Sequence, residues 1–181
     1  MQTYFVRRTG IAAGASELSA ALTRLRSFEE RPSGLPVRWL HSYALREADG
    51  RFGLACLFEA EDAPTLLRHA ASVRLPAAEI LPMTGRRIVR PFAPTLVFLV
   101  RRRNVWQTAA ELERSAALSH WIGDEEMAGL LRWLRSYSVR EADGTLGSVC
   151  LYQGVDAQAL RDHAARVGIA ADEITPVIGR I

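Results

Sequence analysis

Lysine is absent from the 181-residue sequence, and all 23 of its basic residues are arginine. Arginine favours bidentate and stacked contacts over the point-charge contacts that lysine makes. The 20 acidic residues are spread along the chain and reduce the formal net charge to +3. A charge this small and evenly mixed excludes a polyelectrolyte, and it lacks the electrostatic footprint that nucleic-acid binding needs.

Cysteine and long apolar runs are equally scarce. Two cysteines and four histidines, with no CxxC pair and no Cys/His cluster, argue against a disulfide scaffold and a structural zinc site. No window reaches the roughly 18 apolar residues that a membrane span requires, and the N-terminus has no apolar core long enough for a signal peptide. We therefore expect a soluble cytoplasmic protein with free thiols and with neither a membrane nor a nucleic-acid partner.

What the sequence does contain is an internal repeat. The segment RWLHSYALREADG that begins at Arg38 returns as RWLRSYSVREADG at Arg132. The offset of about 94 positions needs no gap, and roughly a third of the overlapped positions are identical. We predict two tandem units over residues 1–91 and 95–181, joined by residues 92–94. Units of this size are near the lower limit for a sufficient core, so we expect them to lean on each other.

The first unit begins with a short β-branched and aromatic run over residues 3–8, followed by leucines at helical spacing. Alternating stretches over residues 37–46 and 51–59 flank Asp49 and Gly50, a turn dipeptide that favours a hairpin. A second helix and a final strand complete the unit, and the same succession returns in the second unit. The order is βαββαβ, which predicts an α+β fold of two ferredoxin-like units, each with four antiparallel strands and two helices on one face.

Capping signals mark the helix starts. Asp62 and Asp156 stand where the N-cap of the second helix belongs in each unit, and Thr108 with Glu111 forms a capping box in the second. Because such a unit covers only one face of its sheet, something must cover the other face. We predict that the two sheets face each other in an intramolecular pseudo-dimeric α/β barrel, so that the chain is a pseudo-dimeric monomer or a homodimer.

The register of the hairpin decides which side chains share the face between the sheets. A two-residue turn at Asp49 and Gly50 gathers aromatic, polar-tipped and thiol side chains on that face, whereas a one-residue bulge at the turn would invert the assignment. An apolar cleft with a few convergent polar groups is what a small-molecule pocket requires. The predicted pocket residues are Trp39, His41, Tyr43, Cys56 and Phe58, with their counterparts Trp133, Arg135, Tyr137, Cys150 and Tyr152.

The two cysteines lie in mid-strand, where a free cysteine is commonly a small core hydrophobe. A nucleophilic role for Cys56 or Cys150 would need a base or a cation, which His41 or Arg135 could supply. The READG segments at the hairpin tips resemble a charged motif, but we interpret them as turn chemistry with local ion pairs of little energy.

The motif SYxxREADGxxGxxCL, followed by HAxxxxxxAxEI, occurs in both units. In these residues the sequence resembles a bacterial domain-of-unknown-function family whose founding description is of a nickel-binding or nickel-responsive protein with a ferredoxin-like fold. The resemblance implies small units that dimerise through their sheets into an α/β barrel, which a tandem chain could form within itself. It also implies metal ligands, of which His69 and His163 are the matching residues here. At the first strands, where the family carries histidine, this sequence has arginine.

The residues themselves leave two readings for these histidines. His69 and His163 lie on the flank of an apolar helical stripe, which favours a partly buried ring tied to the backbone or to Glu79 or Glu173. A metal role would require two or three further ligands to converge, since imidazole alone gives nickel or zinc neither the ligand count nor the geometry that they prefer. No cofactor is therefore required, while nickel or another divalent metal remains open.

Together these features favour a protein that binds a small ligand or a nickel-type metal ion. The alternative is an enzyme, such as an oxygenase, isomerase or cyclase, that acts on a small apolar substrate between the two sheets, an idea that rests on fold analogy. RNA-recognition modules share the βαββαβ order, but the second unit lacks most of their aromatic signature, and a face packed against the other unit could not stack bases.

Overall fold

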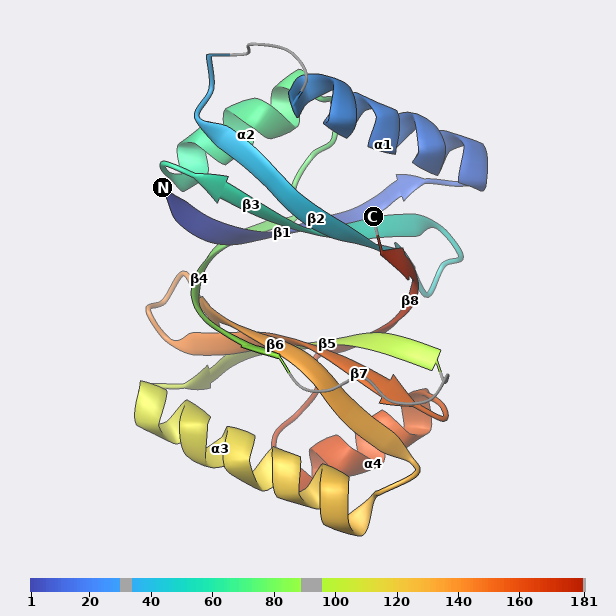
Figure 1. Ribbon diagram of the computed structural model, residues 1–181, viewed down its shortest axis with the longest axis vertical. Coiled ribbons are helices and arrows are strands. Elements are labelled where there is room, and N and C mark those ends of the chain that lie inside the picture. The colour runs from blue at the N-terminus through green and yellow to red at the C-terminus, as the bar shows by residue number, and fades with distance from the viewer. Residues whose placement is uncertain (30–33, 89–95, 181) are drawn as a thin grey trace. The chain divides into compact units, whose positions relative to one another are not determined.

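The computed structural model describes residues 1–29, 34–88 and 96–180, and the same succession of elements occurs twice along the chain (Figure 1). The first half contains β1 (Gln2–Ala12), α1 (Ala15–Glu29), β2 (Val37–Arg46), β3 (Phe52–Ala60), α2 (Ala63–Ser72) and β4 (Glu79–Ile88). The second contains β5 (Leu96–Trp106), α3 (Ala109–Trp121), the π-helical turn η1 (Ile122–Glu126), β6 (Leu131–Arg140), β7 (Leu146–Gly154), α4 (Ala157–Val167) and β8 (Glu173–Arg180). The predicted α+β class and βαββαβ order are confirmed.

Two compact units divide the chain. Unit 1 comprises Met1–Met83 with Val177–Ile181, and unit 2 comprises Thr84–Pro176. Strands β4 and β8 therefore each contribute residues to both units. The expected connector over residues 92–94 lies outside the described residues, and the sequence boundaries 1–91 and 95–181 stay a prediction.

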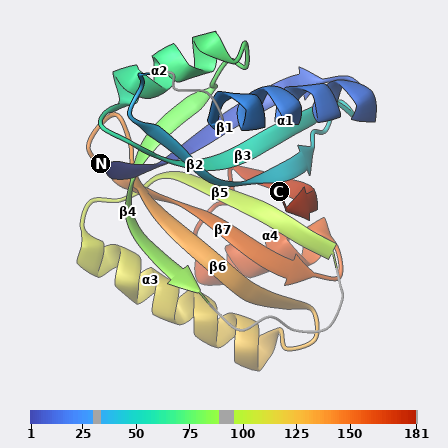
Figure 2. The ribbon, with the colours of Figure 1, turned by 45° about the horizontal axis from the view of Figure 1, so that its top comes forward.

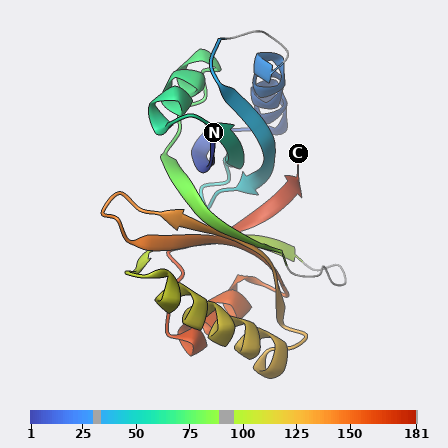
Figure 3. The ribbon, with the colours of Figure 1, turned by 60° about the vertical axis from the view of Figure 1, so that its left-hand side comes forward.

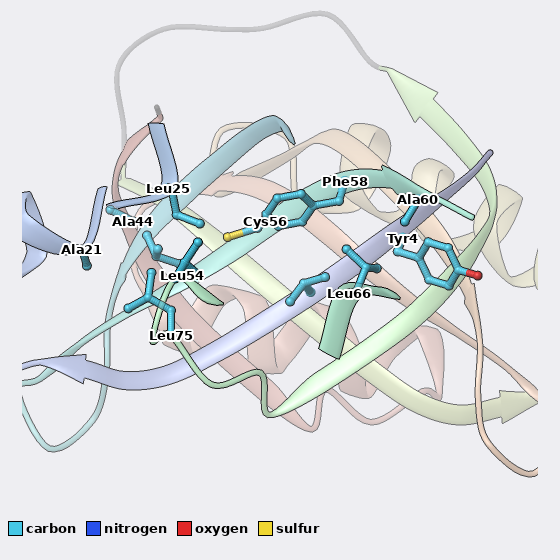
Figure 4. Close-up of a cluster of buried hydrophobic side chains, with 12 residues drawn as sticks. Tyr4, Ala21, Leu25, Ala44, Leu54, Cys56, Phe58, Ala60, Leu66 and Leu75 are labelled. Carbon is cyan, nitrogen blue, oxygen red and sulfur yellow. The ribbon is translucent and has the colours of Figure 1, made fainter. Parts of the chain in front are cut away.

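In unit 1, β3 is the central strand and pairs antiparallel with both β1 and β2. Strand β1 also pairs with the first half of β4, and the last residues of β8 pair with β2. Helices α1 and α2 cover one face of this sheet (Figures 1 and 2). Under them, Leu25 and Leu66 from the helices meet Leu54, Cys56 and Phe58 of β3 in an apolar cluster (Figure 4).

Unit 2 repeats this arrangement, with β7 between β5 and β6 and with helices α3 and α4 on one face (Figure 3). The registers match those of unit 1, since Arg102 of β5 pairs with Ser148 of β7 as Arg8 of β1 pairs with Leu54 of β3. Residues about 94 positions apart are therefore structural counterparts. This equivalence allows the two interiors to be compared side chain by side chain.

The helix starts follow the sequence signals. Asp62 accepts a hydrogen bond from the Thr65 N–H, with 2.8 Å between oxygen and nitrogen, and Asp156 accepts one from Ala159 at the same distance. Thr108 and Glu111 form a complete capping box at α3. The predicted caps are confirmed. No helix among the described residues is both long enough and apolar enough to cross a membrane.

The hairpin turns differ from the prediction. The Gly50 N–H donates to the Glu47 carbonyl at 3.0 Å, and the Glu47 N–H donates to the Arg51 carbonyl at 2.8 Å, so three residues rather than two form the loop. Gly50 closes this loop with a φ of +82°, a left-handed conformation that glycine adopts without steric cost. The same hydrogen bonds form at Glu141, Gly144 and Thr145 in unit 2. The added loop residue shifts the register by one, so the predicted face assignment is wrong.

The READG motif does more than close the turn. Arg46 bonds locally, with its guanidinium donating to the Gly50 carbonyl at 2.8 Å. Glu47, by contrast, reaches back to the first strand and pairs with Arg7, with 2.8 Å between Nη2 and Oε2. In unit 2 the Arg101–Glu141 pair has the same 2.8 Å separation, and its side chains are 1% and 7% exposed. The prediction of purely local, exposed pairs is therefore wrong, because the glutamate joins two distant parts of its unit.

Candidate functional site

A cavity of about 30 Å³ lies inside unit 2, between the sheet and the two helices. A cavity needs about 10–15 Å³ to hold one water, so this one can take water or a few atoms of a ligand. Leu112, Ser115 and Ala116 of α3 are only partly buried and form its rim. The lining residues are Arg102, Trp106, Leu112, Ser115, Ala116, Ser119, Trp133, Ser136, Ser148, Cys150, Tyr152, Val167 and Ile169.

At two counterpart positions of this cavity, unit 1 has residues of its apolar core. Ser119 of α3 replaces Leu25 of α1, and Ser148 of β7 replaces Leu54 of β3. Both leucines are almost fully buried, at 1% and 0% exposure. Each leucine-to-serine difference removes three carbon atoms and adds one hydroxyl oxygen on the cavity side of the sheet or helix. The side-chain composition of unit 2 therefore opens space that unit 1 fills with hydrocarbon.

A hydrogen-bonded chain crosses one wall of the cavity. The Ser119 hydroxyl lies 3.1 Å from the Tyr152 phenol oxygen, and Nε2 of His163 lies 3.0 Å from the Ser119 carbonyl oxygen. A carbonyl oxygen only accepts, so Nε2 carries the proton and Nδ1 has a free lone pair. Nδ1 is buried without a hydrogen-bond partner in the part of the chain that the structure describes.

Burial sets the protonation states of this wall. Desolvation lowers the pKa of His163, even though its hydrogen bond to Ser119 acts in the opposite direction. Desolvation also raises the pKa of the Tyr152 phenol, against the opposing effect of the Arg102 guanidinium. Both groups are therefore neutral at pH 7, and the wall offers hydrogen-bonding groups without adding a charge.

Arg102 is the positively charged residue in the lining of the cavity. Its side chain lies with its guanidinium carbon 5.9 Å from the centre of the Tyr152 ring, and the residue is 4% exposed. Burial acts to lower the pKa of Arg102, but the Tyr152 phenol and the Cys150 thiol beside it raise the pKa overall. The guanidinium therefore stays protonated inside the unit.

Smaller polar groups complete the lining. The Cys150 thiol lies 3.1 Å from the Ser136 hydroxyl and 3.5 Å from that of Ser148. Across the cavity, the Trp106 indole N–H donates to Ser115 at 2.8 Å. The site is thus an aromatic and aliphatic enclosure with one cation and several hydroxyl groups, which is the usual composition of a small-ligand site.

The predicted pocket residues are divided between two faces of each sheet. Trp133, Cys150 and Tyr152 line the cavity under the helices, and their counterparts Trp39, Cys56 and Phe58 belong to the unit 1 core. The remaining four lie on the opposite sheet faces as two neighbouring pairs, His41 with Tyr43 and Arg135 with Tyr137. The strand register shifts between Trp39 and His41 in β2 and between Trp133 and Arg135 in β6. These shifts place the tryptophans on the helix-covered face and the following residues on the opposite face. One shared face for all ten is therefore wrong.

Arg102, Ser119 and Ser148 are not among the residues predicted from the sequence. A signal for the two serines was present, because each occupies a position where the other unit has a leucine in an apolar pattern. Pairwise comparison of the two units would have marked them. Arg102 had no such signal, since both units carry arginine there and only the surrounding side chains distinguish the two sites.

Neither histidine has the surroundings of a metal ligand. His69 packs against Phe28 and Phe58, with ring centroids 4.4 and 4.9 Å away, and its pKa falls to about 4 through burial and the nearby Arg8 cation. His163 uses Nε2 for the Ser119 backbone, as expected for a structural histidine, and not for Glu173. Among the described residues, no group of three or more His, Cys, Asp or Glu side chains could hold a metal ion. The residues around the two histidines thus do not fit a nickel centre.

The thiols differ in their surroundings. Cys56 is fully buried, and desolvation raises its pKa even though Arg8 and Ser42 act to lower it. It is therefore a protonated core residue. Cys150 lies at the cavity wall, and Arg135, the cation expected to activate it, lies on the other face of the sheet. The expected pairing of either thiol with His41 or Arg135 is not formed.

The chain is an α+β protein of ferredoxin-like units, with a small cavity beneath the helices of one unit. Residues 98–177 match the model of a family described as "Nickel responsive protein SCO4226-like". The matched segment contains the cavity-lining residues of unit 2. No curated protein matches the sequence.

Solved structures show the same fold. A provisionally assigned monooxygenase from Lactobacillus acidophilus superposes with a TM-score of 0.51 at 7% identity, covering 99% of this chain and 94% of that one. Another, from Fusobacterium nucleatum, gives a TM-score of 0.50 at 9% identity, covering 97% of this chain and 91% of that one. At such low identity the likeness concerns the fold alone.

Proposed function

We propose that the protein binds a small polar ligand in the cavity of unit 2. The observation that carries this proposal is the paired difference between the units, in which buried leucines of unit 1 are serines that line the cavity in unit 2. A fold gains stability from filling such space with hydrocarbon. Polar residues at these positions forgo that gain, as binding sites commonly do. Unit 1 carries leucine at these positions of its apolar core, and unit 2 carries the proposed site.

A variant that copies unit 1 tests this proposal. Ser148→Leu installs in unit 2 the side chain that unit 1 carries at the same place, and Leu54→Val is the matched control in the unit 1 core. The probes are acetate, acetamide and acetamidinium, which share one shape and differ in charge. Binding is followed by NMR through the indole N–H signals of Trp106 and Trp133, with those of Trp39 and Trp121 as internal references.

We expect at least one of the three probes to shift the Trp106 and Trp133 signals saturably in the wild type and in Leu54→Val, but not in Ser148→Leu. If no probe shifts these signals, or if Ser148→Leu binds as the wild type does, the cavity is not a ligand site. The four tryptophan signals are assigned from Trp→Phe variants.

A metal-ion function is the second candidate, and the family match over residues 98–177 favours it. His69 and His163 are its candidate ligands by resemblance, and because no further ligands gather around them among the described residues, an ion there would need ligands from outside that part of the chain. Nickel chloride titrated calorimetrically into the wild type and a His69→Ala, His163→Ala double variant tests it. Lower affinity in the double variant would support the carried-over ligands, and equal affinity would eliminate them. An enzymatic role on an apolar substrate and the facing of the two sheets as a barrel also stay predictions.

A further inference from the structure

The Arg102 guanidinium interacts with the Tyr152 side chain but forms no ion pair among the described residues of unit 2. No carboxylate of the described chain forms an ion pair with it, although Asp172 acts on it electrostatically. The Oδ2 atom of Asp172 instead accepts a hydrogen bond from the Arg103 backbone N–H at 2.6 Å. Buried cations are normally paired with anions, because removal from water is otherwise costly. Arg102 is thus a buried guanidinium that lines a cavity and has no ion pair among the described residues, and an anion in the cavity would neutralise its charge.

The neighbouring residue, Arg101, is a buried arginine that does have an ion pair. Arg101 is also buried, but Glu141 lies 2.8 Å from its guanidinium on the other face of the sheet. One strand therefore carries two consecutive buried arginines, of which the first is neutralised by the chain itself. The second faces the cavity.

From this arrangement we infer that the ligand of unit 2 is a small carboxylate, held by Arg102. The inference rests on the function proposed above and adds the chemical class of the ligand. The planar guanidinium matches a carboxylate with two parallel N–H···O bonds. The hydroxyl pair of Tyr152 and Ser119 can donate one further hydrogen bond, because one of its two protons forms the bond between them.

Unit 1 provides the internal control. Arg8 is 1% exposed, and its Nε and Nη1 atoms have no hydrogen-bond partner among the described residues. Leu54 and Phe58 occupy the places of the polar side chains that line the cavity in unit 2. Arg8 therefore has a similar charge environment without the serine-lined space, and anion binding should not depend on it.

The three isosteric probes separate charge from shape. At constant ionic strength, we expect acetate to bind roughly tenfold or more tightly than acetamide, since a charge-assisted hydrogen bond is about twice as strong as a neutral one. Acetamidinium should not bind. Arg102→Gln should abolish the preference for acetate over acetamide, Arg102→Lys should keep part of it, and Arg8→Gln should leave it unchanged.

The outcomes distinguish this inference from the proposed function. Equal binding of acetate and acetamide, lost in Ser148→Leu, would retain the ligand site and overturn its preference for carboxylates. An acetate preference that survives Arg102→Gln would overturn the role of Arg102. Circular dichroism and the signals of Trp39 and Trp121 report whether each variant is folded, and Arg102→Lys keeps the test valid if Arg102→Gln unfolds.

Discussion

His69 gives the fold a pH dependence at the scale of a single residue. The ring is 1% exposed, and both of its nitrogens lack a hydrogen-bond partner among the described residues. Burial is the main cause that lowers its pKa from 6.5 to about 4, and the Arg8 cation adds to the effect. The folded state therefore binds a proton less readily than the unfolded chain, so stability falls as protons become available.

The first prediction concerns this histidine. The free energy of unfolding should be at its full value above pH 6.5 and should fall by up to about 3 kcal/mol as the pH drops towards 4. His69→Phe should remove this share of the pH dependence, because it keeps a ring between Phe28 and Phe58 without a proton site. Urea unfolding at several pH values between 7.5 and 4 measures the effect.

The control for that measurement is the exposed His120 on α3, replaced by glutamine. His120→Gln should retain the pH dependence of the wild type. A His69→Phe profile that is as steep as the wild-type profile would show that other groups cause the acid sensitivity.

Between neighbouring strands, a glycine makes room for the buried ion pair. A Cβ atom at Gly147 of β7 would lie 2.0 Å from Oε1 of Glu141, 2.6 Å from the Arg102 carbonyl oxygen and 2.7 Å from Nη1 of Arg101. Gly53 is equally crowded in unit 1, where the nearest atom is Oε1 of Glu47 at 1.9 Å. The glycine and the glutamate of the READGxxG motif therefore serve one contact, in which the arginine and glutamate side chains cross the β7 or β3 backbone.

The second prediction follows from this crowding. Gly147→Ala should lower the free energy of unfolding by about 3 kcal/mol, because the added methyl group displaces one partner of a buried pair. Gly179→Ala on β8 is the matched control, since no atom lies within 4 Å of the position of its Cβ. Denaturant unfolding of the two variants measures the difference. Equal stability would mean that the pair can shift without cost.

The sequence predicts the elements well because their signals are local. The capping aspartates, the glycine of the turn and the apolar spacing of the second helices each act within a few residues, and the structure follows them. The predicted faces of the hairpin are wrong because one extra loop residue and one strand bulge each shift the alternation of side chains, and neither has a distinctive sequence signal. The distant partner of Glu47 likewise depends on the register of a strand 40 residues away.

The residues of the candidate site could likewise be predicted from the sequence only in part. Residue type alone drew attention to aromatic rings, thiols and histidines, and three of these, Trp133, Cys150 and Tyr152, do line the cavity. The charge of the site comes instead from Arg102, and its space comes from serines. Arginine and serine are common residues, so their presence in a sequence does not indicate a site. Their role depends on what surrounds them, which the chain determines only after it has folded.

At the scale of the whole molecule, the two units share one succession of elements but have different interiors. Unit 1 fills the region beneath its helices with leucine and phenylalanine, and unit 2 keeps serine and tyrosine there. The packing of the interior therefore contributes differently to the stability of the two units, although their folds are similar. This difference predicts that exchanging the residues at counterpart positions changes the free energy of unfolding in opposite directions.

The third prediction exchanges the residues at one pair of counterpart positions. Ser148→Leu should raise the free energy of unfolding by about 1 kcal/mol, since it fills space with hydrocarbon at the cost of one weak bond to Cys150. Leu54→Ser should lower it by about 3 kcal/mol, because it leaves a cavity and a hydroxyl group in an apolar core. Denaturant unfolding and thermal melts of the two variants give both signs. If both variants are destabilised to the same extent, the interior of unit 2 is as tightly packed as that of unit 1, and its serines are part of a filled core instead of a site kept open.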